Sequence, residues 1–244
     1  MVVYLPREEF LNDYWAYEPG QHVTLITPTQ NGKTTLACQL LDRTCSPELP
    51  AVMAVMKPRD PVPSQWTQRM GFTEVPTWPP AKWPWQNSPR GYTHWPKHSL
   101  SSVEADNAHL KKEISRSLNW WYRRGNSIYF ADEVYGLCAE LELQKELIAG
   151  WTRAGGMKGG LWCGAQKPSG VQGQGGVPTF AYNSVSHLFL GHDPDSVNRK
   201  RFGEIGGIDP KLVSDIVFSL KQYEFLYVRK ADTTGGPYLS VIGP

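Results

Sequence analysis

The stretch Thr24–Leu41, TLITPTQNGKTTLACQLL, decides how the rest of this sequence is interpreted. The run His22–Thr27, rich in β-prone residues, predicts a short strand, and hydrophobic residues at helical spacing predict an amphipathic helix from about Lys33 to Arg43. The segment TPTQNGKT is then the turn between them. A strand-to-helix turn that ends in Gly-Lys-Thr is typical of a phosphate-binding loop, because backbone amides at the helix start point at the phosphates.

One position departs from the phosphate-loop pattern. Thr27 stands where the pattern has glycine, and we expect Pro28 to tighten the turn instead. Lys33 would place its charge at the β- and γ-phosphates of ATP, and the Thr34 hydroxyl would bind Mg²⁺. With one mismatch, the pattern alone also fits an ordinary strand–turn–helix. The predicted nucleotide-binding residues are Thr27, Pro28, Thr29, Gln30, Asn31, Gly32, Lys33, Thr34 and Thr35.

A second motif, SIYFADE, supplies the acids that such a loop needs. Its β-prone apolar residues predict a buried strand that delivers Asp132 and Glu133 to its carboxyl end. Asp132 would hold the Mg²⁺ shell through water, and Glu133 would polarise the attacking water. Adjacent acids after a strand are also common at the start of a solvated loop. Together the two motifs predict ATP binding, and Glu133 favours hydrolysis because a simple switch or kinase usually lacks it.

Strands alternate with helices along most of the 244 residues, which predicts one α/β domain with a mostly parallel sheet flanked by helices. Residues 1–20 are expected to be a lead-in that packs on this domain. Helices are expected from about 101 to 125, 136 to 151 and 209 to 220, and residues 223–243 predict a C-terminal antiparallel strand pair. The segment 61–96 contains five tryptophans and many prolines. It predicts an ordered insertion at the rim of the sheet without a regular helix.

Composition excludes several other classes of protein. No run of eighteen apolar residues occurs, so no membrane span is expected, and charges near the N-terminus argue against an export signal. The four cysteines form no metal-ligand spacing and predict reduced, mostly buried thiols of a cytoplasmic protein. The net charge of +2 gives no global signature of nucleic-acid binding, so DNA contacts would come from local patches.

The order of these motifs resembles the FtsK/HerA superfamily of DNA-pumping ATPases, which includes conjugation coupling proteins and packaging ATPases of some viruses. The resemblance rests on the GKT loop, the ADE strand, Arg153 in WTRAGGMKGG, and Gln166 in LWCGAQKPS. It continues through YNSVSHLFLGHDPDS and the final strands, and so covers most of residues 20–244. It implies a P-loop NTPase fold of the RecA/FtsK-like kind and an ATPase coupled to DNA translocation.

The resemblance also implies partners and further site residues. Gln166, which would end a strand next to the Asp132 strand, would sense the γ-phosphate. Arg153 would act as a finger in the neighbouring subunit's site, with Arg199 and Arg201 as competitors, or be a surface arginine at a helix C-terminus. The expected assembly is a homo-oligomeric ring, a pentamer or hexamer, around double-stranded DNA read without sequence preference. The Gly170–Gly176 loop, flanked by Lys158 and Lys167, would touch phosphates or be an ordinary surface loop.

Departures from the family leave two rival interpretations open. The sequence carries the insertion at 61–96 and no DNA-reading winged-helix domain, and its small size favours a viral or mobile-element motor in the host cytoplasm or associated with a virion. A capsid portal or membrane vertex protein would then be a further partner. One rival is an ATP-dependent assembly or secretion-type interaction protein that does not pump DNA. The other is a P-loop kinase, which would need an acceptor pocket.

Overall fold

A ten-stranded sheet forms the centre of the computed structural model, which describes residues 2–81, 88–99, 101–168, 181, 185–202, 208–230 and 238–244. The strands are β1 Val3–Pro6, β2 Val23–Ile26, β3 Ala51–Ala54, β4 Thr73–Val75, β5 Gly91–His94, β6 Ser127–Ala131, β7 Gly159–Ala165, β8 His187–Gly191, β9 Phe225–Arg229 and β10 Tyr238–Gly243. Their order across the sheet is β1-β10-β9-β8-β2-β7-β6-β3-β5-β4. The central strands pair in parallel, and β9 runs antiparallel to both β8 and β10.

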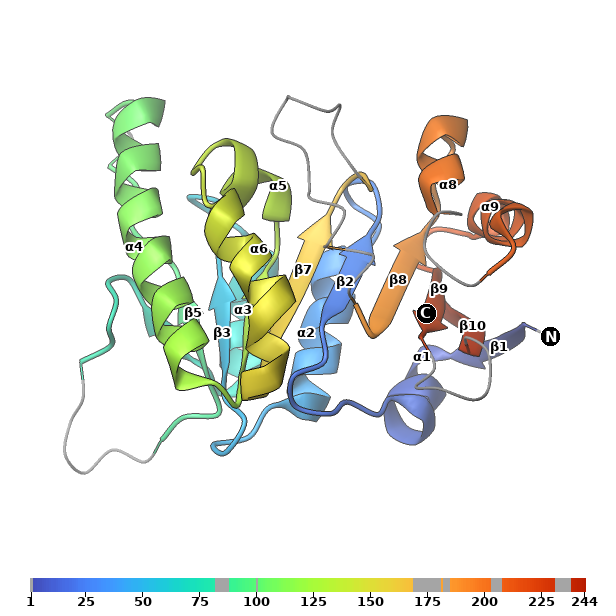
Figure 1. Ribbon diagram of the computed structural model, residues 1–244, viewed down its shortest axis with the longest axis horizontal. Coiled ribbons are helices and arrows are strands. Elements are labelled where there is room, and N and C mark those ends of the chain that lie inside the picture. Colours follow the sequence, from blue (N-terminus) through green and yellow to red (C-terminus); the bar gives the residue numbers. More distant parts are fainter. Residues whose placement is uncertain are drawn as a thin grey trace.

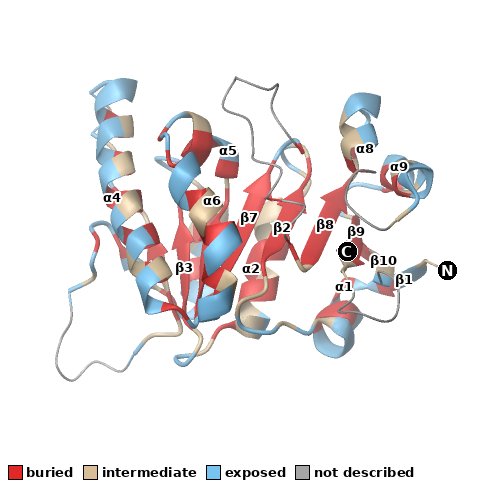
Figure 2. Ribbon diagram, viewed as in Figure 1, coloured by how far each residue is buried: buried red, intermediate tan, exposed pale blue. Residues whose placement is uncertain are grey.

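Helices cover both faces of this sheet (Figure 1). They are α1 Arg7–Glu9, α2 Lys33–Thr44, α3 Pro61–Met70, α4 Val103–Arg124, α5 Val134–Ala139, α6 Gln144–Arg153, α8 Ser196–Phe202 and α9 Pro210–Ser219, with a π-turn η1 (Phe10–Tyr14) and a 3-10 turn η2 (Ala154–Met157). One apolar core lies between the sheet and α4, α5, α6 and α9, and a second lies between the sheet and α2, α3 and η1. The strands between these layers are almost fully buried (Figure 2).

The structure confirms the predicted mixed α/β sheet, mostly parallel and flanked by helices, with the antiparallel pair β9–β10. Helix α4 shows why hydrophobic spacing predicts a helix correctly here. Four of its apolar residues recur at helical spacing and all four are buried: Leu110, Ile114, Leu118 and Trp121. It ends before Gly125, whose φ of +61° and ψ of −171° form a conformation that is open to glycine and strained for other residues. The link at residues 231–237 between the last two strands lies outside the described residues.

The expectation that segment 61–96 contains no regular helix was wrong. Helix α3 occupies Pro61–Met70, and its two prolines stand in the first turn, where a helix needs no N–H donor. Asp60 caps it by accepting a hydrogen bond from the Val62 amide. Strands β4 and β5 then extend the sheet beyond β3 at its rim. Residues 82–87 of the segment lie outside the described part of the chain.

The helix expected from 136 to 151 is divided into α5 and α6. Glu142, between them, has a φ of +54°, which an α-helix cannot contain. Leu141 and Leu143 on either side are fully buried, so core packing holds the break.

The N-terminal residues form part of the sheet. Strand β1 pairs in parallel with β10, and Phe10 that follows is fully buried against Phe189 and Tyr227. All four cysteines are buried and unpaired, as the sequence predicts. Within the described ranges, no helix combines the length and the apolar composition that crossing a membrane requires.

Candidate functional site

Three segments that carry the predicted chemistry meet at one edge of the sheet. Strands β2, β6 and β7 are parallel, so the phosphate-loop residues, the Asp132–Glu133 pair and Gln166 all follow carboxyl strand ends (Figure 1). Strand β7 lies between the other two. Ligands of open α/β sheets bind at such an edge, because the loops that leave the strands converge there.

The loop before α2 has the backbone of an anion cradle. Gly32 adopts a φ of +80° and is the residue from which α2 begins. Gln30 also has a positive φ, of 64°. Among the described hydrogen bonds, none is donated by the amides of residues 32–35. These donors at a helix start are therefore available to a phosphate.

Thr27 is buried at the base of this loop, where it contacts the protein interior. Its side chain is 1% exposed and its amide donates to the Ala165 carbonyl, 3.1 Å away, so neither group faces a nucleotide. Of the predicted nucleotide-binding residues, Thr27 is thus the one that the structure places beneath the loop. Pro28 to Thr35 are partly or fully exposed along it.

Thr34 and Asp132 form the candidate Mg²⁺ site. The Thr34 hydroxyl donates to Asp132 Oδ1 at 2.8 Å, although 98 residues separate them. Asp132 is only 9% exposed, at the end of β6. A hydroxyl and a carboxylate held together are oxygen ligands of the kind that Mg²⁺ prefers, so the residues fit this ion.

Two side chains from neighbouring segments contact the Glu133 carboxylate. Lys33 Nζ lies 3.5 Å from Glu133 Oε2, and Gln166 Nε2 donates to the same oxygen at 2.8 Å. Glu133 Oε1 is buried and has no hydrogen-bond partner among the described residues. The structure therefore joins Lys33, Glu133 and Gln166, which the sequence predicts to act together, in one contact group.

Gly164 belongs to this site and is not among the residues predicted from the sequence. A Cβ at this position in β7 would lie 2.2 Å from the Asp132 carbonyl oxygen and 3.1 Å from Lys33 Cδ. The absent side chain lets the Asp132 backbone and the lysine stem pass side by side. A glycine inside a buried strand, in GGLWCGAQ, was the available signal, since such a glycine often marks a close backbone approach.

Arg153 is not part of this group. It is exposed at the end of α6, just before η2 and the start of β7, and so lies at the opposite edge of the sheet. Lys158 also precedes β7, whereas Lys167 follows it, so the two lysines lie at opposite edges of the sheet. The Gly170–Gly176 loop itself lies outside the described residues.

The two competing arginines follow β8, on α8, at the same edge as the phosphate loop. Arg199 donates to the Asp193 carbonyl at 2.9 Å, and its guanidinium lies over the Phe218 ring at 4.7 Å from the centroid. Arg201 is half-buried beside it in α8. Their position is thus closer to the nucleotide edge than that of Arg153.

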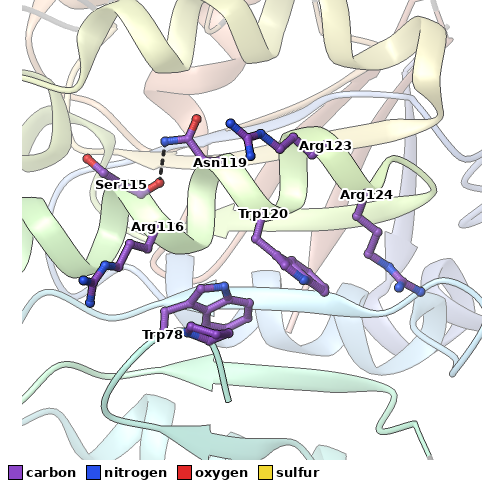
Figure 3. A pocket seen from close by; sticks show the side chains of 8 residues that line it. Trp78, Ser115, Arg116, Asn119, Trp120, Arg123 and Arg124 are labelled. Carbon is purple, nitrogen blue, oxygen red and sulfur yellow. Dashed lines mark hydrogen bonds between the residues drawn. The ribbon is translucent and has the colours of Figure 1, made fainter. Parts of the chain in front are cut away.

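A separate cavity of about 860 Å³ is lined by α4 and by the segment at Trp78 and Pro79 (Figure 3). Arg124 lies over the Trp120 ring at 5.4 Å, and Trp120 contacts Trp78 edge to face. Arg116 pairs with the buried Glu113 at 2.7 Å. The lining residues are Trp78, Pro79, Ser115, Arg116, Asn119, Trp120, Arg123 and Arg124.

Solved structures resemble this fold over nearly its whole length. The genome packaging NTPase B204 from Sulfolobus turreted icosahedral virus 2, in complex with AMPPCP, has a TM-score of 0.57 and 12% identity, covering 93% of this chain and 100% of its own. B204, the DNA-packaging ATPase from Sulfolobus turreted icosahedral virus, has a TM-score of 0.54 and 14% identity, covering 87% and 94%. EssC (ATPases 2 and 3) from Geobacillus thermodenitrificans has a TM-score of 0.53 and 10% identity, covering 94% and 41%.

These likenesses confirm, at the level of the fold, the predicted resemblance to FtsK/HerA-type P-loop ATPases. No protein-family model and no curated protein matches the sequence. At identities of 10–14%, likeness establishes the fold, and the activity has to be argued from the site.

Proposed function

We propose that this protein is an ATPase whose hydrolysis drives the movement of double-stranded DNA, as a homo-oligomeric ring in genome packaging or DNA transfer. The observation that carries the proposal is the convergence of Lys33 and Gln166 on one carboxylate oxygen of Glu133, beside the Thr34–Asp132 pair. A loop that only connected a strand to a helix would need none of these contacts.

The phosphates of ATP would lie against the amides of residues 32–35. Lys33 Nζ would leave Glu133 for the β- and γ-phosphates, because a triphosphate carries more negative charge than one carboxylate. Thr34 and Asp132 would hold Mg²⁺, which neutralises phosphate charge when bound. The Thr34–Asp132 contact supports this assignment, since both groups already lie at one point.

Glu133 would act as the base toward water. Its Oε2 holds the Gln166 amide, so Oε1, which has no partner among the described residues, is the oxygen left to accept a proton. Gln166 would orient the carboxylate and respond to the γ-phosphate at the end of β7. A P-loop kinase would need an acceptor in place of this water, and the joined Glu133 and Gln166 favour hydrolysis.

The DNA-moving part of the proposal is supported by the fold likeness to the packaging NTPases. Ring formation would place a cation from one subunit at the ATP of the next. Arg153 remains a candidate for this role only if the neighbour presents its nucleotide edge to the end of α6. The half-buried Arg199 and Arg201 start from the correct edge of the sheet. In either case the isolated monomer would hydrolyse ATP poorly, so specific activity should rise with protein concentration.

The test is steady-state ATP hydrolysis with and without linear double-stranded DNA, beside Glu133→Gln. We expect DNA to stimulate hydrolysis, and the variant to lose about 10²- to 10⁴-fold of the rate while still binding ATP, because only the base is removed. Hydrolysis that does not respond to DNA would contradict the motor, and an active Glu133→Gln variant would contradict the assigned base.

A second candidate function is ATP-dependent assembly on a protein partner without DNA pumping. The observation that favours it is the cavity beside α4, where arginines and tryptophans, residues common in binding hot spots, lie together (Figure 3). Two results together would favour this alternative: a rate of ATP hydrolysis that does not respond to DNA, and weaker binding of the protein partner by a Trp120→Ala variant.

A further inference from the structure

Tyr223 lies beside the phosphate-binding loop, although it is distant from it in the sequence. It belongs to the turn between α9 and β9. A Cβ built on Gly32 would lie 3.0 Å from Cδ1 and 3.8 Å from Cε1 of Tyr223, so the aromatic ring lies directly against the loop glycine. The pairing of Gly191 with Phe225 places the start of β9 at the nucleotide edge of the sheet.

The backbone of Tyr223 is held in an uncommon conformation. Its φ is +69°, in the left-handed region that bulky residues rarely adopt. The Arg7 guanidinium donates to the Tyr223 carbonyl oxygen and lies over the Phe225 ring, and Arg7 itself is 8% exposed. Glu224 closes the turn by donating its amide to the Lys221 carbonyl at 3.1 Å. A buried cation from the first helix thus fixes this turn.

The position of the ring is not explained by core packing. Tyr223 is 44% exposed, and no described hydrogen bond engages its hydroxyl. An ordinary surface turn would relieve the positive φ with glycine or asparagine. Here the chain instead keeps an exposed aromatic side chain against the loop.

The order of the strands indicates which end of a bound nucleotide would lie near the Tyr223 ring. Strand β2 lies between β7 and β8. Glu133 and Gln166 mark the β7 and β6 side, where the γ-phosphate would lie, and Tyr223 lies on the β8 and β9 side. A nucleotide whose phosphates point toward Glu133 therefore extends its other end toward Tyr223.

We propose that Tyr223 is the base-stacking residue of the nucleotide site, with a purine ring packed on its exposed face. The proposal rests on the proposed ATP binding and adds the part of the ligand that the loop does not recognise. Stacking requires a π-face and no hydrogen-bond code, so we expect adenine and guanine nucleotides to be retained better than pyrimidine nucleotides.

The experiment compares the affinities of ATP and inorganic tripolyphosphate, titrated without DNA, for the unmodified chain and three variants. Tyr223→Ala should weaken ATP by about 5- to 100-fold, the range of one aromatic–base stack, and should leave tripolyphosphate unchanged. Tyr223→Phe should retain ATP affinity. Tyr238→Ala is the matched control, because Tyr238 is 37% exposed at the opposite edge, where β10 begins.

Equal losses for ATP and tripolyphosphate in Tyr223→Ala would overturn the proposal, because the ring would then act only on the loop. Equal affinities of the unmodified chain for the two ligands would overturn it as well, since the base would add nothing. If the unmodified chain bound neither ligand, ATP binding itself would fail, and the inference with it. A chain that binds ATP through Tyr223 but ignores DNA would contradict the motor alone.

Discussion

Thr27, directly after β2, and Gly191, at the end of the neighbouring strand β8, are complementary in volume. A Cβ added to Gly191 would lie 2.2 Å from Thr27 Oγ1 and 2.5 Å from Thr27 Cβ. The phosphate-loop pattern has glycine at the position of Thr27. In this chain the residue without a side chain is Gly191, on the adjacent strand. This exchange explains how the loop accommodates threonine at its first position.

Gly191→Ala should therefore destabilise the protein through its clash with Thr27. We expect the free energy of unfolding to fall by about 1–3 kcal/mol, as overpacked interiors do, measured by denaturant unfolding. Adding Thr27→Gly should restore part of the loss, whereas Thr27→Ser keeps the clashing oxygen and should not. Equal stabilities of the two double variants would contradict the assigned contact.

Gln166→Ala should slow hydrolysis and leave ATP binding nearly intact. The amide donates to Glu133 Oε2 and is expected to orient that carboxylate, without itself holding the phosphates. A hydrogen bond to a charged group contributes about 1.5–3 kcal/mol, so kcat should fall by about 10- to 100-fold with little change in KM. A variant that instead raised KM at constant kcat would show that Gln166 binds substrate.

Thr34→Val should change the Mg²⁺ requirement, because valine keeps the volume of threonine and removes the hydroxyl that contacts Asp132. We expect the Mg²⁺ concentration for half-maximal activity to rise about tenfold or more, in keeping with loss of one metal-directed oxygen contact. Thr34→Ser retains the hydroxyl and is the control. The same metal dependence in both variants would remove Thr34 from the metal site.

Three buried histidines predict loss of stability in mild acid. Burial lowers the pKa of His22 and of His94 to about 4 and that of His187 to about 3, so each stays neutral in the fold at pH 5. In the unfolded chain their pKa is about 6.5, so the unfolded state binds more protons and stability falls as the pH drops below that value.

Each histidine contributes up to about 1.4 kcal/mol per pH unit, so the free energy of unfolding should decline by up to about 4 kcal/mol per unit near pH 5. Denaturant unfolding between pH 7 and 5 measures this slope. His187→Gln should reduce the slope by about a third, measured against its own stability at pH 7. An unchanged stability across this range would contradict the assigned burial.

Local sequence patterns predicted several parts of the site. The strand before Thr27, the helix from Lys33 and the strand ending at Asp132 were all predicted from hydrophobic periodicity and turn residues. Such patterns work because each depends on neighbours within a few residues along the chain. Gln166 was predicted to end a strand next to the Asp132 strand, and it follows β7, which pairs with β6. Its hydrogen bond to Glu133 was not predicted from the sequence.

Short-range patterns did not predict features that depend on contacts between segments distant in the sequence. The proline-rich start of α3 was misjudged because composition does not say which prolines fall in a first turn. Arg153 was selected from its motif, and its place at the far edge of the sheet follows from the direction of α6.

Residue type and short-range spacing were enough to predict a phosphate loop, an acidic strand end and an alternating α/β fold. They did not predict that Gly191 makes room for Thr27, that Gly164 lets Lys33 pass Asp132, or that Tyr223 lies against Gly32, which are contacts made by the folded chain. The physical reason is that strand order and close packing bring together atoms from segments that have no neighbour relation in the sequence.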